Sequence, residues 1–83
     1  MTREELFNHV RGLVEQSIRD GGNEPPEITE ATVLLGSGIG LDSLGLATIV
    51  VELEEKTGVS PFSGGFVNFT TVGELVTLFH KED

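Results

Sequence analysis

The chain has 83 residues, no cysteine, and 14 acidic against 5 basic residues, which gives a formal net charge of −9 at neutral pH. This length suits one small domain, taken here as residues 1–83, and the lack of cysteine excludes disulfides and Cys-based zinc sites. The negative charge repels nucleic-acid phosphate and anionic lipid, and it favours basic protein partners.

The first predicted element is a helix over residues 3–19. Thr2 followed by Glu5 matches the capping box, in which each side chain binds the backbone N–H of the other residue. The glycines after Asp20 end the helix, because glycine adopts the left-handed conformation that closes helices. Apolar residues recur at helical spacing, namely Leu6, Val10, Leu13, Val14 and Ile18.

A long connection over residues 23–40 follows, and it contains Pro25 and Pro26. Connections of this length are uncommon in compact domains and are often functional. The glycine-rich end, "GSGIG" at residues 36–40, lacks the last glycine of a dinucleotide fingerprint and the lysine of a P-loop. It therefore predicts a flexible turn that leads into a helix.

The second predicted helix covers residues 44–57. The β-branched run at residues 48–51 would also suit a buried strand. The length of the segment, Lys56 in the last turn and Gly58 as a C-terminal cap favour a helix. Four apolar residues share one face and are assigned to the core, namely Leu46, Ile49, Val50 and Leu53.

The segment over residues 59–69 is rich in turn formers and is expected to hold one short helical turn, with Phe62, Phe66 and Phe69 covering the end of a bundle. A further helix begins after Thr71, which has Glu74 three residues later. Its apolar stripe is Val72, Leu75, Val76 and Phe79. The predicted fold class is all-α, a bundle of three to four helices with a long loop between the first two and a short third helix.

The sequence gives little support to catalysis by its own side chains. His9 and His80 lie near opposite ends of the chain and are interpreted as solvent-exposed helix residues. The glutamates of the second helix do not follow the alternating ligands of a calcium loop. The hydrolase motif G-x-S-x-G is incomplete around Ser43, because Leu41 stands where the first glycine is needed.

Asp42, Ser43 and Leu44 stand at the predicted start of the second helix. Asp and Ser are both favoured N-cap residues, so either Asp42 or Ser43 can cap this helix, and capping alone would account for both. A serine here also presents its hydroxyl beside unpaired backbone N–H groups and the positive end of the helix dipole, which stabilise an attached phosphate. Two roles stay open for Ser43, a cap and a phosphodiester site.

The stretches "LLGSGIGLDSLGLATIVVELEEKTGV" and "FVNFTTVGELVTLF" resemble the acyl carrier protein family. The resemblance covers residues 34–79, and its most specific element is Asp-Ser-Leu at the head of the second helix. It implies that a phosphopantetheinyl transferase containing magnesium transfers 4′-phosphopantetheine from coenzyme A to Ser43. The thiol of that group would then carry acyl or aminoacyl groups as thioesters. The resemblance also implies that Asp42 positions the serine and that Leu44 contacts the transferase.

A flank of the second helix formed by Leu44, Ala47 and Val51 lies away from the core face and is expected to bind partners. The alternative is that it packs against the connecting loop or the short helix. Glu55 and its neighbouring glutamates are expected to add a modest, salt-dependent attraction. Expected partners are the transferase, acyl- or aminoacyl-loading enzymes, and downstream synthases with basic or apolar docking patches.

Two departures from the family pattern bear on the pathway. Many fatty-acid carriers have acidic residues where this chain has Gly45 and Thr48. The weaker acidic surface near Ser43 favours a stand-alone carrier of a specialised pathway over primary fatty-acid synthesis. The competing hypothesis is a non-covalent acidic helical interaction module without the prosthetic group.

The chain is expected to be a cytoplasmic monomer. Its start, "MTREELFNHV", lacks the apolar stretch of a signal peptide, and its longest apolar run, "LATIVV", is too short to span a bilayer. Neither a nucleic acid nor a membrane is therefore among the expected partners.

Overall fold

The computed structural model describes residues 1–36, 38–65 and 67–80, which form three α-helices. Helix α1 spans Arg3–Asp20, α2 spans Ser43–Thr57 and α3 spans Val72–Phe79. Within the described ranges the extended backbone makes one isolated antiparallel bridge, between Val33 and Thr71, and no strand. The predicted all-α class is confirmed, and the β-branched run in α2 is helical.

Two helices begin with the capping box expected from the sequence. At α1 the Glu5 N–H donates to Thr2 Oγ1 at 3.1 Å, and the Thr2 N–H donates to Glu5 Oε1 at 2.8 Å. At α3 the pairs are Glu74 N–H to Thr71 Oγ1 at 3.2 Å and Thr71 N–H to Glu74 Oε1 at 3.0 Å. The backbone bond from each threonine lowers the pKa of the glutamate that accepts it.

The helix ends differ slightly from the expected ones. Helix α1 continues to Asp20, one residue beyond the prediction, and the left-handed glycine that follows is Gly22, with φ of 85°. Helix α2 ends as predicted, because Gly58 adopts φ of 72° and its N–H donates to the Glu54 carbonyl.

One apolar core joins the three helices and the long connection. One of the four predicted α2 core positions is less enclosed than expected, because Val50 is half-buried. In α1 the same holds for Leu13. The buried core residues are Leu6, Val10, Val14, Ile18, Ile28, Leu34, Leu41, Leu46, Ile49, Leu53, Val72, Leu75, Val76 and Phe79.

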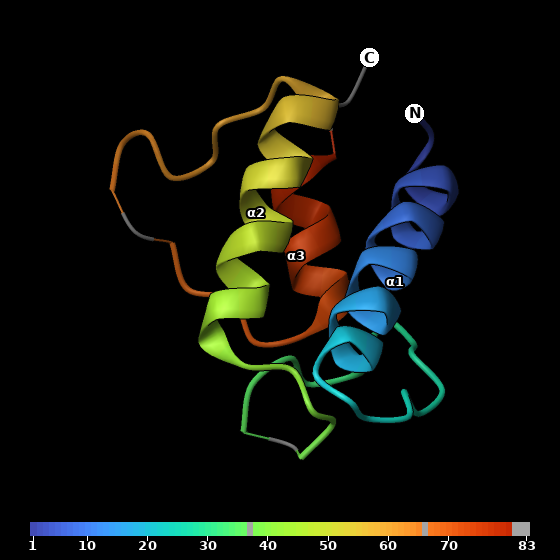
Figure 1. The fold of residues 1–83 in the computed structure, drawn as a ribbon. Helices are drawn as coiled ribbons and strands as arrows, with labels where there is room; N and C mark the ends of the chain where they lie inside the picture. Colours follow the sequence, from blue (N-terminus) through green and yellow to red (C-terminus); the bar gives the residue numbers. More distant parts are fainter. Residues whose placement is uncertain (37, 66, 81–83) are drawn as a thin grey trace.

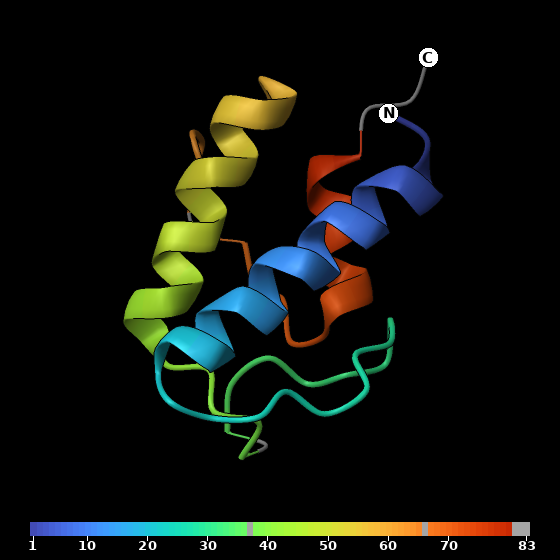
Figure 2. The ribbon, with the colours of Figure 1, turned by 45° about the vertical axis from the view of Figure 1, so that its right-hand side comes forward.

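The connection over residues 21–42 passes beneath one end of the bundle, where α1 ends and α2 and α3 begin (Figures 1 and 2). Backbone bonds tie it to the start of α3, including Leu34 N–H to the Thr70 carbonyl and Val72 N–H to the Thr32 carbonyl, both at 2.9 Å. These bonds fix the connection against the start of α3. The predicted flexible turn at residues 36–40 includes Ser37, which lies outside the described residues.

Arg3 links three segments that are distant in the sequence. Its guanidinium donates to Glu30 Oε1 at 2.6 Å, to Thr77 Oγ1 at 2.8 Å and to the Gly73 carbonyl at 3.2 Å. The arginine thus joins α1 to the long connection and to α3. Because both charged side chains are partly exposed, the ion pair itself contributes little free energy.

The described residues between α2 and α3 form turns in place of the short helix. The Ser63 N–H donates to the Ser60 carbonyl and the Gly65 N–H donates to the Phe62 carbonyl. Proline and consecutive glycines in this segment disfavour helix, which accounts for the difference. Two of the three phenylalanines act as predicted: the Phe62 ring lies 5.9 Å from that of Phe69 and 6.4 Å from that of Phe79, centroid to centroid. Phe66 lies outside the described residues.

Candidate prosthetic-group site at the start of α2

Ser43 is the first residue of α2, and its side chain is exposed. Asp42 is the N-cap, because its Oδ1 accepts the Gly45 N–H at 2.7 Å and its carbonyl accepts the Leu46 N–H at 3.0 Å. Of the two caps that the sequence left open, the structure uses Asp42. The helix therefore begins one residue earlier than predicted, and the Ser43 hydroxyl is not needed to start it.

The backbone around Ser43 suits an attached anion. Asp42 satisfies the N–H groups of Gly45 and Leu46, whereas those of Ser43 and Leu44 donate to no group within the described ranges. These two donors lie at the positive end of the helix dipole, and the first turn contains no acidic residue. A phosphate on Ser43 Oγ would be stabilised by both features.

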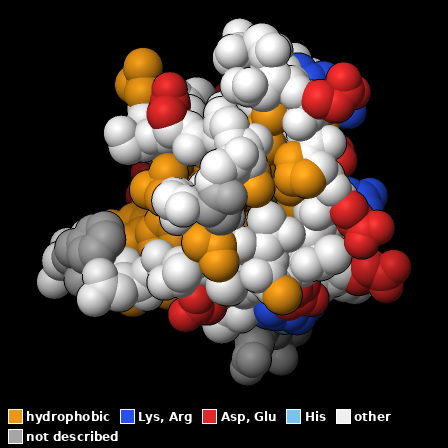
Figure 3. Space-filling view, turned by 90° about the horizontal axis from the view of Figure 1, so that it is seen from below, with side chains coloured by type: hydrophobic (Ala, Val, Ile, Leu, Met, Phe, Trp, Pro, Cys, Tyr) orange, Lys and Arg blue, Asp and Glu red, His pale blue; other side chains and the backbone are white. Residues whose placement is uncertain are grey.

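Ser43 borders a hollow of about 380 Å³ between α2 and the connection that follows it. Nearly all of its lining is apolar, and Figure 3 shows hydrophobic side chains gathered on this side of the molecule when it is viewed from below. We call it the apolar hollow. Its lining residues are Ser43, Leu46, Ala47, Val50, Val51, Phe62 and Phe69.

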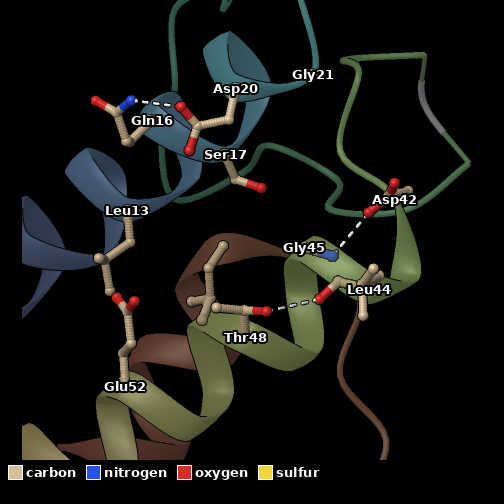
Figure 4. Close-up of a pocket in the computed structure, with 11 residues that line it drawn as sticks. Leu13, Gln16, Ser17, Asp20, Gly21, Asp42, Leu44, Gly45, Thr48 and Glu52 are labelled. Atoms are coloured by element: carbon tan, nitrogen blue, oxygen red, sulfur yellow. Dashed lines mark hydrogen bonds between the residues drawn. The ribbon is translucent and has the colours of Figure 1, made fainter.

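The predicted partner flank is exposed, but it is divided. Leu44 is 76% exposed and Val51 is 53% exposed, and Ala47 is exposed as well. Ala47 and Val51 line the apolar hollow, whereas Leu44 lines a groove on the other side of α2, toward α1 (Figure 4). The described residues therefore do not support the alternative, in which the whole flank packs against the connecting loop or the short helix.

Glu55 is exposed and borders neither cavity. It follows Ser43 by twelve residues in α2, which corresponds to about 18 Å along the helix axis. The structure therefore places Glu55 outside the immediate surroundings of Ser43.

The histidines are less exposed than expected, since both His9 and His80 are half-buried. His80 follows the last residue of α3, and its N–H donates to the Val76 carbonyl at 2.9 Å. No group of three or more potential metal-binding side chains occurs in the described part of the chain. In the same ranges no helix is long and apolar enough to cross a membrane.

Sequence reasoning missed both cavities beside Ser43. The apolar hollow depends on Phe62 and Phe69, which lie 19 and 26 residues after Ser43 in the chain, and their approach to α2 has no local signal. The groove toward α1 depends on Gln16, Ser17 and Asp20, which gave no sign of lying beside Ser43. The one signal in the sequence was that the apolar residues of α2 occupy more than one face of the helix, so that some of them had to lie outside the core.

Comparison with known families gives this geometry its context. The family model described as "Phosphopantetheine attachment site" matches residues 11–79. The chain belongs to this acyl carrier protein family. Its prosthetic group is covalently attached 4′-phosphopantetheine, and it acts as a carrier and not as an enzyme. Phosphopantetheinyl transferases and enzymes that handle acyl groups are its general class of partner.

The similarity to individual carriers extends over nearly the whole chain. An acyl carrier protein from Thermotoga maritima is 28% identical over 81 residues, which cover 98% of this chain and 95% of that protein. A meromycolate extension acyl carrier protein from Mycobacterium leprae is 31% identical, covering 98% of this chain and 67% of that protein. Its counterpart from Mycobacterium bovis is 30% identical with the same coverage. No solved structure matches the chain significantly.

Proposed function

We propose that Ser43 is the residue that carries 4′-phosphopantetheine, and that the chain delivers acyl intermediates as thioesters within a specialised pathway. The observation that supports Ser43 as the attachment site is that Asp42 and Ser43 have separate roles at the start of α2. Asp42 caps the helix, so the exposed Ser43 hydroxyl is available, with two backbone donors beside it.

The residues of this chain have limited tasks in the transfer. Ser43 supplies the oxygen that forms the new bond to the phosphorus bearing pantetheine, while the bond from that phosphorus to the nucleotide part of coenzyme A breaks. The hydroxyl proton passes to the transferase. Asp42 fixes the backbone from which Ser43 projects, and exposed Leu44 is available to the transferase.

The apolar hollow favours acyl over charged aminoacyl cargo. It adjoins Ser43, and its walls include Val51, Phe62 and Phe69 with almost no polar surface. An apolar chain gains free energy by leaving water, whereas a charged amino group would be desolvated there without a partner.

Two observations support a specialised pathway. Gly45 and Thr48 replace the acidic residues of many fatty-acid carriers, and they leave the first turns of α2 without a carboxylate. Two of the relatives above are named for meromycolate extension. We propose that the loading enzyme and synthases recognise apolar surface more than acidic surface.

The test is the intact mass of the chain after incubation with coenzyme A, magnesium and a broad-specificity phosphopantetheinyl transferase. We expect the wild-type chain to gain one phosphopantetheinyl group, Ser43→Ala to gain none, and Ser63→Ala, a matched change at another exposed serine, to behave as wild type. An unmodified wild-type chain beside a modified control carrier would favour the non-covalent interaction module. Modification of Ser43→Ala would refute the attachment site.

A further inference from the structure

Two glycines lie on either side of Ser43 in the chain, and both contact the end of α1. Gly40 stands three residues before Ser43, and Gly45 stands two residues after it. A Cβ atom on Gly40 would lie 3.1 Å from Cβ and Nδ2 of Asn23 and 3.2 Å from its Cγ. A Cβ atom on Gly45 would collide with Ser17 Oγ, and Figure 4 shows Ser17 pointing from α1 toward this part of α2. The segment that carries Ser43 therefore meets the end of α1 at two points, and both are too close for a side chain to fit without movement.

Asn23 is held in place by the end of α1. Its N–H donates to the Ile18 carbonyl at 3.1 Å, in the turn that contains Gly22 with φ of 85°. Its Nδ2 donates to the Gly21 carbonyl at 3.4 Å. The backbone of α1 therefore fixes the position of Asn23, although its side chain is exposed.

Gly40 sets the direction of the chain toward Ser43. Its φ of 92° lies in a region that residues with a side chain rarely adopt. The next residue, Leu41, is buried in the core, and its Cδ1 lies 3.3 Å from the position of a Cβ atom on Gly45. Asp42 then caps α2, and Ser43 follows. A displacement at Gly40 is therefore carried to Ser43 within three residues.

The contact with Asn23 distinguishes Gly40 from its neighbouring glycines. The stretch before Ser43 contains Gly36, Gly38 and Gly40, all with positive φ. A Cβ atom on Gly36 or Gly38 would meet nothing within 4 Å. Of the three, Gly40 alone contacts another segment through the space that a side chain would occupy, so this contact is what restrains an otherwise permissive backbone.

We propose that Asn23 is a positioning residue for the modification of Ser43. The inference rests on the proposed function, because it concerns transfer to that serine. The contact with Gly40 holds the start of α2 in the orientation that the transferase binds. When the contact is lost, only a fraction of the molecules presents Ser43 in that orientation at any moment, and the apparent affinity of the transferase falls by that fraction. Asn23 precedes Ser43 by twenty residues, so no local motif links the two.

The experiment measures kcat and KM for this chain as the substrate of a broad-specificity phosphopantetheinyl transferase, with coenzyme A and magnesium held constant. Asn23→Ala removes two of the three atoms nearest to the Gly40 position, and it should raise KM about threefold while kcat stays within about 1.5-fold. Asn23→Asp keeps the shape of the side chain and should retain the parental KM. Asn68→Ala, a matched change at another exposed asparagine, should retain it as well.

Two glycine variants separate the contact from backbone strain. Gly40→Ala and Gly38→Ala both place a side chain at positive φ, but only Gly40→Ala presses it against Asn23. Gly40→Ala should therefore raise KM about tenfold, and Gly38→Ala should raise it less than about threefold. Equal increases for the two variants would show that strain, and not the contact with Asn23, governs the reaction, and would overturn the proposal.

A measurement without the enzyme tests the same contact. The backbone NMR order parameters of Gly40 and Leu41 should fall to about 0.6 in Asn23→Ala and stay near about 0.85 in Asn68→Ala. The melting temperatures of both variants should stay within about 2 °C of the parent, because the core is unchanged. The proposal is refuted if Asn23→Ala keeps the parental KM or order parameters, or if its KM rises only together with a larger loss of melting temperature. Failure of the proposed function would appear separately, as an unmodified wild-type chain in the mass measurement.

Discussion

The two sides of α2 offer a neighbour different surfaces. The side toward α1 lines a groove whose lining includes the carboxylates of Asp20 and Glu52, whereas the side toward the following connection lines the apolar hollow that Ser43 borders. Consecutive residues of one helix take part in both. Position around the helix axis, and not position along the chain, therefore separates charge from apolar contact at this site.

The largest effect should come from Leu53, a core residue of α2 that lines neither cavity. Leu53 is fully buried and Val51 is 53% exposed, although both are apolar residues of one helix. Leu53→Ala should lower the free energy of unfolding by about 3 kcal/mol, because it leaves a cavity in the core. Val51→Ala should lower it by less than about 0.5 kcal/mol. Similar losses in chemical denaturation would show that the flank is part of the core.

The next effect concerns the exposed apolar residues of α2. Val51→Asp places a charge in the apolar hollow and should slow acyl loading about tenfold, while the unfolding midpoint changes little. Leu44→Ala should reduce transferase modification by several-fold for lack of its exposed contact. Gly12→Asp is the matched control, since it adds the same charge on open surface of α1. Equal losses for Val51→Asp and Gly12→Asp would remove the apolar hollow from recognition.

Two variants at the start of α2 distinguish the residue that caps the helix from the residue that is modified. Asp42→Ala removes the bond to the Gly45 N–H and should lower the free energy of unfolding by about 1 kcal/mol. Ser43→Ala keeps that bond and should change the free energy by less than about 0.5 kcal/mol, although it abolishes modification. A larger loss for Ser43→Ala than for Asp42→Ala would reverse the two assignments.

A smaller effect is expected from the acidic residue that borders neither cavity. Glu55→Lys should slow association with a loading enzyme about twofold at low salt and leave the dissociation rate unchanged, since an exposed charge mainly steers encounter. The measurement is a salt series of both rate constants. A Glu55 effect confined to dissociation would place this residue inside the bound interface.

The smallest effect is on stability in acid. Hydrogen bonds from the capping threonines lower the pKa of Glu5 and Glu74 below the ordinary value of 4.5. Each ionised carboxylate therefore stabilises the fold above that value, and the contribution is lost as pH falls through the lowered pKa. Glu74→Gln should flatten the fall in unfolding midpoint between about pH 5 and about pH 3. An unchanged slope would show that the α3 capping box does not contribute.

Local patterns predicted the helices well. Thr2 with Glu5 and Thr71 with Glu74 mark helix starts because each capping box is complete within four residues. The start of α2 was ambiguous for a physical reason, since Asp42 and Ser43 are adjacent residues of similar capping ability. Only the geometry of the Asp42 bond to Gly45 decides between them.

Contacts between distant segments were beyond sequence reasoning. Gly45 was interpreted as a lost acidic residue, but its environment shows that a side chain there would meet Ser17 of α1. The link from Arg3 to Glu30 and Thr77 and the approach of Phe62 to Phe79 likewise depend on tertiary packing. The proposed attachment residue, Ser43, could be predicted from a local motif, whereas the two cavities beside it could not.

The most direct test of the account is fragment-ion mass spectrometry of the chain after modification, which locates the added group on one residue. The account predicts phosphopantetheine on Ser43 alone, in the peptide that contains Asp42 and Leu44. The group on any other serine of the chain would contradict it, because Ser43 has an exposed side chain at the start of α2, where Asp42 and not Ser43 caps the helix.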